Sequence, residues 1–210
     1  MASLTIESRD SVLRYFESRL RRFGHSYAAL GWVSLENQQR RFDTLAGVDS
    51  LDGASVLDVG CGLGDFCGYL AQRVGGFDYT GLDLSAPMIQ RASERHPSAR
   101  FIQGDILSFR TDRRFDYVVA SGVYNLETLD NEPVMREILR AMFSLCTKGA
   151  AATMTGRRGA ALRGVEEVPG SVHEFDPEAM KAFCLTLTPS VVLREDYLAG
   201  DFALYLRRPG

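Results

Sequence analysis

Three closely spaced glycines, Gly60, Gly62 and Gly64, follow a short apolar run in the stretch VLDVGCGLGD. A glycine turn directly after a predicted strand lets the backbone come close to a nucleotide-like ligand. The dinucleotide-binding pattern G-x-G-x-x-G would place its third glycine at position 65, where this chain has Asp65. The turn is therefore either a defective dinucleotide site or an intact site for a different cofactor.

Acidic residues end the first three predicted strands. The carboxylate of Asp58 either ties down the N–H groups of the glycine turn or contacts a ligand, and the two roles are compatible. Asp83 ends the second strand, where one carboxylate can accept hydrogen bonds from both hydroxyls of a ribose. Asp105 either caps the segment that follows it or accepts a hydrogen bond from an adenine amino group. The fourth strand ends in the polar sequence SGVYN.

The elements that must position these residues alternate along the chain. Strands are predicted at 54–60, 79–85, 99–105, 115–122 and 150–155, and helices at 8–20, 35–47, 65–75, 87–96, 132–146 and 176–187. Such alternation predicts a doubly wound α/β fold with a parallel sheet and helices on both faces. The β-rich runs 190–197 and 201–208 predict a terminal antiparallel hairpin, which brings the sheet to seven strands.

The length of 210 residues favours a single domain. Within it we expect a helical N-terminal extension or lid over residues 1–50, a cofactor-binding core over 51–155, and a substrate-side loop, helix and hairpin over 156–210. The glycine-rich stretch after residue 155 carries Arg157, Arg158 and Arg163, which are either solvated or clamp a carboxylate substrate.

Taken together, the motifs LDVGCGLGD, GLDLS, QGDI and FDYVVASGVYN resemble the class I S-adenosylmethionine-dependent methyltransferases, in the order and at the spacing of that family. The resemblance covers roughly residues 54 to 124. It implies a Rossmann-like fold and S-adenosylmethionine as the cofactor, with S-adenosylhomocysteine as the product. Because this cofactor has no diphosphate, an acid at position 65 is tolerable, and the dinucleotide interpretation is disfavoured.

The resemblance also implies a role for each matched residue. Gly60, Gly62 and Gly64 would pass beneath the methionine moiety and the ribose, and Asp83 would hold the ribose hydroxyls. The adenine would lie beside Leu84 and Ile106, with Asp105 at its amino group, and Ser121 would lie near the amino-acid portion of the cofactor. Tyr124 and Asn125 would lie where the transferred group leaves.

Trp32 is the single tryptophan, in a segment predicted to fold over the cofactor cleft. Its ring would either face the sulfonium, because a cation is attracted to an aromatic face, or pack the N-terminal helices onto the sheet. A general base, if one is required, is sought among His25, His173 and Tyr124, although His173 can equally be a solvated loop residue. The predicted catalytic set is Tyr124, Asn125 and His173.

Methyl transfer to a small molecule is the function that these features favour. The cofactor motifs would look the same in an enzyme that transfers an aminocarboxypropyl group or cyclises the methionine chain, with release of methylthioadenosine. They would also look the same in a non-catalytic S-adenosylmethionine-binding module. The motif N-P-P-Y of amino-methylating enzymes is absent from the sequence.

The composition also indicates which classes of partner, such as nucleic acid, membranes and metal ions, are not expected. A net charge of −3 predicts no bulk attraction to nucleic acid, and the pairs Arg21–Arg22 and Arg40–Arg41 are expected on solvated helix faces. With no apolar run long enough for a signal or a membrane span, we expect no membrane association and a cytoplasmic protein with four reduced cysteines. The scattered cysteines and histidines predict no metal site, and the oligomeric state is not predicted.

Overall fold

The computed structural model describes residues 6–128, 130–156 and 172–209. Its strands are β1 (Ala54–Val59), β2 (Phe77–Asp83), β3 (Arg100–Gln103), β4 (Phe115–Ser121), β5 (Cys146–Thr155), β6 (Val191–Arg194) and β7 (Asp201–Arg207). Its helices are α1 (Ile6–Phe23), α2 (Leu35–Ala46), α3 (Asp65–Ala71), α4 (Ala86–Arg95), α5 (Asn131–Leu145) and α7 (Pro177–Leu185), with a 3-10 turn η1 (Tyr27–Leu30).

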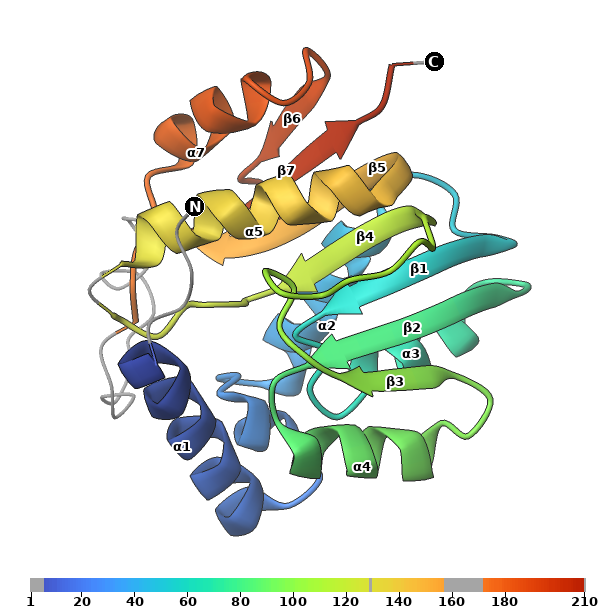
Figure 1. Cartoon of the computed structure of the whole chain (residues 1–210), viewed down its shortest axis with the longest axis vertical. Coiled ribbons are helices and arrows are strands. Elements are labelled where there is room, and N and C mark those ends of the chain that lie inside the picture. Colours follow the sequence, from blue (N-terminus) through green and yellow to red (C-terminus); the bar gives the residue numbers. More distant parts are fainter. Residues whose placement is uncertain (1–5, 129, 157–171, 210) are drawn as a thin grey trace.

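The seven strands form one sheet in the order β3-β2-β1-β4-β5-β7-β6 (Figure 1). The pairs among β1 to β5 are parallel, whereas β7 is antiparallel to both β5 and β6. The predicted seven-stranded, mostly parallel sheet with a terminal antiparallel hairpin is therefore confirmed. The strand β7 is inserted between β5 and β6, so that β6 forms the edge of the sheet.

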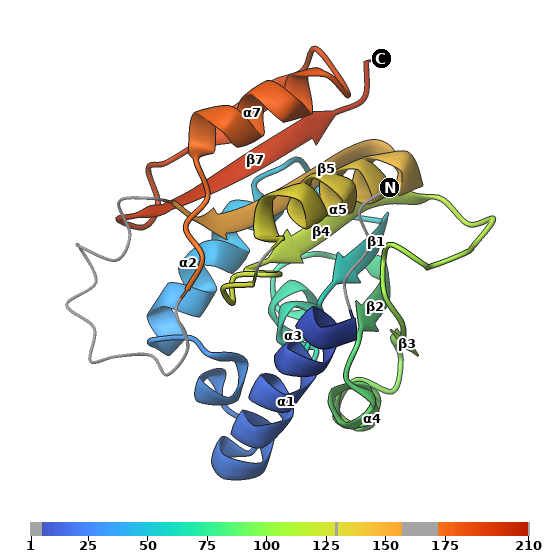
Figure 2. The same ribbon diagram turned by 60° about the vertical axis from the view of Figure 1, so that its left-hand side comes forward.

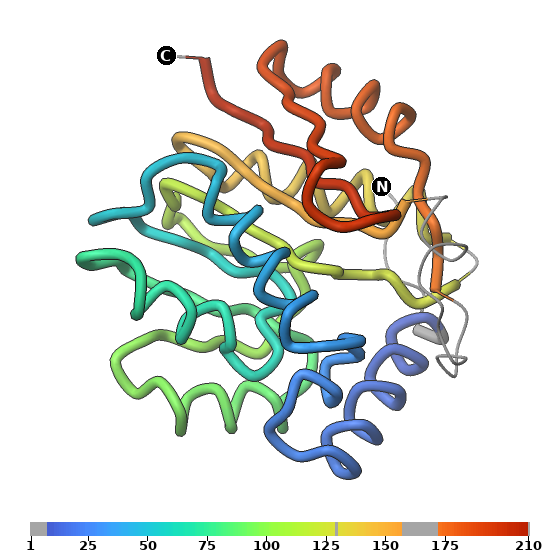
Figure 3. Tube along the Cα trace, turned by 180° about the vertical axis from the view of Figure 1, so that it is seen from behind, coloured from blue at the N-terminus to red at the C-terminus, as the bar shows by residue number. Residues whose placement is uncertain are grey.

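Helices cover both faces of the sheet, which explains why its central strands are continuously apolar. Alternate residues of β1 point to opposite sides: Leu57 and Val59 pack in the cluster that contains α5 and α7, and Val56 packs with residues of α2 and α3. Figure 2 shows α5 and α7 on one side of the sheet, and Figure 3 shows the other side from behind.

The N-terminal segment lies beside the ends of the parallel strands (Figures 1 and 2). A small apolar cluster joins Leu20 of α1 and Ala29 of η1 to Leu63 of the glycine turn and Met88 of α4. Arg19 strengthens this arrangement, because its guanidinium donates two hydrogen bonds, of 2.9 and 2.5 Å, to the carbonyl oxygen of Ala28. The first fifty residues thus place α1 and η1 against the turn at 60–64.

Several predicted elements differ in length from those observed; α3 and β3, for example, end at Ala71 and Gln103, short of their predicted ends. The first helix runs past residue 20 to Phe23, where Arg21 and Arg22 favour the negative end of the helix dipole. The fifth strand begins at Cys146 immediately after α5, because residues 146–149 continue the ladder with β4. The stretch 157–171, which carries the predicted substrate-side loop and Arg157, Arg158 and Arg163, lies outside the described residues.

Candidate active site

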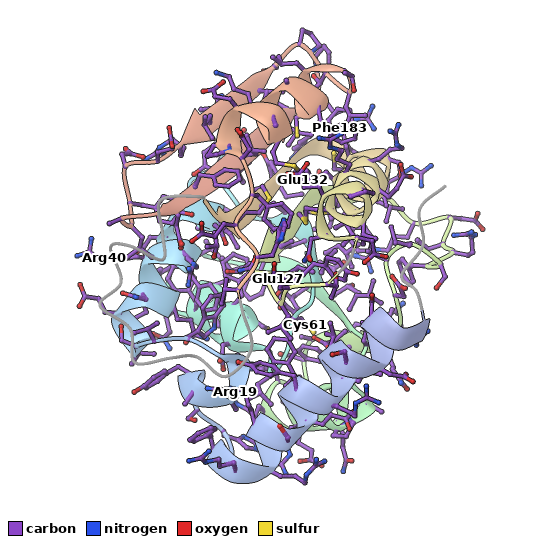
Figure 4. All side chains as sticks on the ribbon, turned by 90° about the vertical axis from the view of Figure 1, so that its left-hand side faces the viewer. Arg19, Arg40, Cys61, Glu127, Glu132 and Phe183 are labelled. Atoms are coloured by element: carbon purple, nitrogen blue, oxygen red, sulfur yellow. The ribbon has the colours of Figure 1, made fainter. Side chains whose placement is uncertain are left out.

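A cavity of about 140 Å³ opens at the carboxyl ends of β1, β2 and β4 and is walled on the far side by α1 and η1. This is the edge of an open α/β sheet where ligands bind. Figure 4 looks at the molecule from the side of α1, with Cys61 of the glycine turn labelled above that helix. Of the residues predicted from sequence, the cavity is lined by Trp32, Gly60, Gly62, Asp83, Leu84, Asp105, Ile106, Ser121 and Tyr124.

The glycine turn follows β1 with a backbone that only glycine adopts readily. Gly60, Gly62 and Gly64 have φ values of 69°, 53° and 73°. A Cβ at Gly62 would lie 2.7 Å from Cδ2 of Leu30, and one at Gly64 would lie 2.9 Å from Cδ2 of His96. Gly60 and Gly62 line the cavity, whereas Gly64 does not and gives room to His96 instead.

Asp83 connects the second strand to the glycine turn. One carboxylate oxygen accepts a hydrogen bond from the N–H of Gly62 and the other from the N–H of Ser85, both at 2.9 Å. Burial raises the pKa of Asp83, and the two N–H donors oppose that rise. The side chain is half-buried and lines the cavity, so its carboxylate can also meet a ligand.

Asp58 lies beside the cavity and does not line it. Its side chain is buried, and one carboxylate oxygen accepts a hydrogen bond from the hydroxyl of Tyr79 on β2. Burial raises the pKa of Asp58 to about 7. The sequence left open a tie to the glycine turn or a ligand contact, and the structure shows a partner on the neighbouring strand instead.

Asp105 follows β3 and both of its predicted functions remain compatible with the structure. Its carboxylate accepts a hydrogen bond of 3.0 Å from the N–H of Leu107, so it caps the turn after the strand. The same residue lines the cavity together with the apolar residues Leu84 and Ile106.

The segment after β4 carries an unusual backbone. Tyr124 has a φ of 62°, the one positive value at a non-glycine residue in the described part of the chain. Its hydroxyl donates a 3.0 Å hydrogen bond to Asp130 at the start of α5, and burial raises its pKa. Ser121 shares a 3.2 Å hydrogen bond with Thr153 of β5.

A second cavity, of about 100 Å³, adjoins the first. Both cavities are lined by Phe16, Leu30, Trp32 and Gly122, which therefore form a shared wall. Asn125 lines the second cavity, whereas Tyr124 lines the first. The left-handed turn at Tyr124 thus places two neighbouring side chains in different cavities.

Trp32 is held in the shared wall by close contacts. The edge of its ring lies over Gly122, where a Cβ would be 2.6 Å from the ring carbon Cη2. The guanidinium of Arg41 lies 4.4 Å from the centre of the ring. One cation therefore already lies against the tryptophan that the sequence suggested for a cationic cofactor, and the ring also packs against Gly122.

Arg41 is a site residue that the sequence interpretation missed. It was expected on a solvated helix face beside Arg40, and that expectation is wrong for Arg41. Arg40 is exposed and points away from the molecule (Figure 4), whereas Arg41 is buried and forms an ion pair with buried Asp201 of β7. Its spacing of four residues from Leu45, which is also buried, was the signal available in the sequence.

His173 lies near the second cavity but lines neither of the two. Its ring packs edge-on against Phe175, with the ring centres 4.6 Å apart, and its backbone N–H donates a 2.7 Å hydrogen bond to the carbonyl of Asn125. His25 follows the end of α1 and likewise lines neither cavity.

Comparison with known proteins shows which protein family this chain is similar to. The sequence model of the methyltransferase domain matches residues 56–149, from β1 into β5. The matches with known proteins support the assignment of the chain to the class I S-adenosylmethionine-dependent methyltransferases. Their cofactor is S-adenosylmethionine, and structural neighbours contain it or S-adenosylhomocysteine. These matches favour S-adenosylmethionine over NAD as the ligand of the glycine turn.

Among relatives of this methyltransferase, the Mycobacterium tuberculosis protein Rv1506c, a methyltransferase by name, is 29% identical over 77% of this chain and 97% of its own length. A trans-aconitate 2-methyltransferase of Paracidovorax citrulli is 40% identical, over 35% of this chain and 28% of that protein. A malonyl-acyl-carrier-protein O-methyltransferase of Pectobacterium atrosepticum is 45% identical, over 30% of this chain and 24% of that protein. The chain thus spans about a quarter of the length of the last two.

The structural neighbours extend the likeness of fold over the whole chain. Magnesium protoporphyrin IX methyltransferase from Synechocystis superposes with a TM-score of 0.70 at 17% identity, covering 96% of this chain and 99% of that chain. The N-methyltransferase NodS from Bradyrhizobium japonicum gives a TM-score of 0.62 at 21% identity, covering 93% and 99%. At these identities the neighbours show the fold of this methyltransferase and leave its acceptor open.

Three further findings concern the cysteines, metal clusters and membrane helices of the described residues. The four cysteines are buried and free. Within the described ranges, no three histidine, cysteine or acidic side chains are grouped to hold a metal ion. No helix of those ranges is both long and apolar enough to cross a membrane.

Proposed function

We propose that this protein transfers the methyl group of S-adenosylmethionine to a small-molecule acceptor and releases S-adenosylhomocysteine. The observation that supports it is the pair of adjoining cavities at the carboxyl edge of the sheet, which share one wall. One cavity lies against the glycine turn and the second lies beyond Trp32 and Gly122. Two reactants held in adjoining cavities meet in a fixed orientation, which is the main contribution a protein makes to such a reaction.

The residues of the first cavity fit the cofactor. Gly60 and Gly62 line the cavity with backbone alone, because a Cβ at either would come within 2.8 Å of Val123 or Leu30, so a ligand would meet the main chain of the turn. The carboxylate of Asp83 faces the cavity at the end of β2, where it would accept hydrogen bonds from the ribose hydroxyls. Leu84 and Ile106 would lie on either side of the adenine.

The remaining predicted residues would hold the reacting end. Ser121 and Gly60 line the cavity on the side of β4 and β1, where the amino-acid portion of the cofactor would lie. Tyr124 would orient the reacting groups rather than take a proton, because its hydroxyl already donates to Asp130 and its pKa is raised. Asn125 would contact the acceptor from the second cavity.

The cofactor supplies the reactive group, so the protein mainly has to align the reactants and exclude water. S-adenosylmethionine, when bound, supplies a methyl group activated by a positively charged sulfur. The side chains of this chain would align the acceptor with that methyl group and exclude water. Phe16, Leu30 and Trp32, which line both cavities, would provide the apolar surroundings at the point of transfer.

The first test of the proposed function measures cofactor binding. Asp83→Ala removes a carboxylate expected to make two charge-assisted hydrogen bonds to the ribose, so the affinity for S-adenosylhomocysteine by calorimetry should fall about 100-fold or more. Asp78→Ala is the matched control, because Asp78 lies on the same strand with an exposed side chain. Equal affinities in the two variants would contradict the assignment.

The by-product decides between methyl transfer and the other uses of the cofactor. The protein is incubated with S-adenosylmethionine and a metabolite extract, and both products are identified by mass spectrometry. S-adenosylhomocysteine and an acceptor 14 mass units heavier (CH₂, about 14 Da) are expected because the transferred methyl replaces a proton. Methylthioadenosine would overturn the proposal, and so would binding without turnover on any acceptor.

A further inference from the structure

The second cavity has a polar floor and an apolar roof. The floor is a continuous row of side chains from the segment that follows β4 and from β5, β7 and α2. The Nδ2 atom of Asn125 lies 3.5 Å from Oγ1 of Thr155, Thr155 is the register partner of Asp201, and Asp201 pairs with Arg41. All four residues line the cavity.

The roof comes from the N-terminal segment. Tyr15 and Phe16 of α1 pack edge to face, with ring centres 5.0 Å apart, and both line the cavity. Leu30 and Trp32 complete this surface next to the point where the two cavities meet. A surface built from three aromatic rings and aliphatic side chains favours a flat apolar body, because such a body buries large areas against it.

The positive and negative side chains of the floor neutralise each other. The guanidinium of Arg41 is paired with the carboxylate of Asp201, and both side chains are less than one-tenth exposed. An ionised carboxylate entering the cavity would lose its hydration beside a pair whose opposite charges already satisfy each other. An uncharged hydroxyl or amino group loses less on desolvation, and Asn125 and Thr155 offer it hydrogen-bonding atoms.

Resting on the proposed function, we propose that the methyl acceptor is a planar, mainly apolar ring compound that carries its nucleophilic hydroxyl or amino group at the ring edge. The ring lies under Phe16 and Trp32, and the nucleophile lies beside Asn125 at the shared wall. In the reaction the oxygen or nitrogen forms a bond to the methyl carbon. The carbon–sulfur bond breaks with its electron pair left on sulfur, and the proton of the hydroxyl or amino group leaves to water.

The first experiment compares head groups on one ring. Protein saturated with S-adenosylhomocysteine is titrated by calorimetry with 5-hydroxyindole, 5-aminoindole, indole-5-carboxylate and the aliphatic tricarboxylate tricarballylate. We expect the hydroxyl or amino compound to bind about tenfold or more tightly than indole-5-carboxylate, and tricarballylate to bind more weakly still. Tighter binding of either carboxylate compound would overturn the acceptor class.

The second experiment tests the floor itself. Asn125→Ala should weaken the preferred indole about tenfold, the value of one buried hydrogen bond, while the affinity for S-adenosylhomocysteine stays within about twofold. Glu127→Ala is the control, because it alters an exposed residue two positions along the same segment. Equal indole affinities in both variants would refute the role of the floor.

The two experiments separate this inference from the proposed function. If the wild-type protein does not bind S-adenosylhomocysteine, the proposed methyl transfer is overturned together with the acceptor class. Retained cofactor binding with methylation of tricarballylate, detected as its methyl ester, would leave methyl transfer standing and overturn the ring-compound class alone.

Discussion

The buried carboxyl group of Asp58 leads to a specific prediction about stability and pH. Its pKa rises from 3.8 to about 7 in the folded protein because the group is buried. Between about pH 4 and pH 7 the folded chain therefore keeps a proton that the unfolded chain has released. The contribution of Asp58 to the free energy of unfolding accordingly falls as the pH rises through this window, and stays low above it.

The size of the effect follows from the same values. The pKa of 3.8 in the unfolded chain and about 7 in the folded chain differ by about three, and each pKa unit corresponds to about 1.4 kcal/mol. The folded protein thus loses about 4 kcal/mol of stability from this group between pH 4 and pH 8. Asp58→Asn removes the titration and keeps an amide oxygen for the hydroxyl of Tyr79.

The assay is urea unfolding at pH 5, 6, 7 and 8 for the wild type and Asp58→Asn. With the amide standing in for the protonated carboxyl, the variant should be more stable than the wild type by about 2 kcal/mol at pH 5 and by about 4 kcal/mol at pH 8. Asp116→Asn is an informative control, because the backbone N–H of Ser55 lowers the pKa of Asp116, so this variant should be less stable than the wild type by the same amount at every pH from 5 to 8. Parallel curves for the wild type and Asp58→Asn would refute the reasoning.

Three other substitutions test contacts around the two cavities. Asn131→Ala removes an amide that donates 2.8 Å hydrogen bonds to the carbonyls of Tyr124 and Leu126, so unfolding experiments should show a loss of about 2–4 kcal/mol; an unchanged midpoint would contradict this. Gly122→Ala places a methyl group against the Trp32 ring at a φ of 62°, and tryptophan fluorescence should shift as the ring moves, whereas an unchanged spectrum would show that the ring can stay. Arg41→Met removes the positive charge that faces the buried carboxylate of Asp201. The melting temperature should therefore fall by an amount equivalent to about 3–5 kcal/mol, and a fall equivalent to less than about 1 kcal/mol would disprove this.

Much of the fold was predictable because its signals are local. The apolar strands, the glycine turn and the helix caps at Ser85 and Asp176 each depend on residues a few positions apart. The order of these elements then restricts the topology to a parallel sheet with a terminal hairpin. For the same reason Asp83 could be placed beside the glycine turn, since both follow the ends of neighbouring parallel strands.

The contacts that were not predicted join residues that are distant in sequence. Asp58 meets Tyr79 across two strands, and Arg41 meets Asp201 from opposite ends of the chain. In the sequence each of these residues is an ordinary polar position. The spacing of apolar residues predicts which face of a helix or strand is buried, but it does not predict which charged side chain of another element lies against that face. The positive φ of Tyr124 was hidden for a similar reason, since a local sequence gives little warning of strain that packing imposes.

The shared wall of the two cavities has a consequence for how such an enzyme can diversify. The segment that matches the methyltransferase family, residues 56–149, supplies Asp83 and the glycine turn of the first cavity. The second cavity takes Gly122, Asn125 and Leu126 from that segment and its remaining lining from the flanks on either side. On the proposed function, changes at flank residues that line the second cavity alone, such as Asn37, Val172 and Leu198, would exchange one acceptor for another without altering the lining of the first cavity.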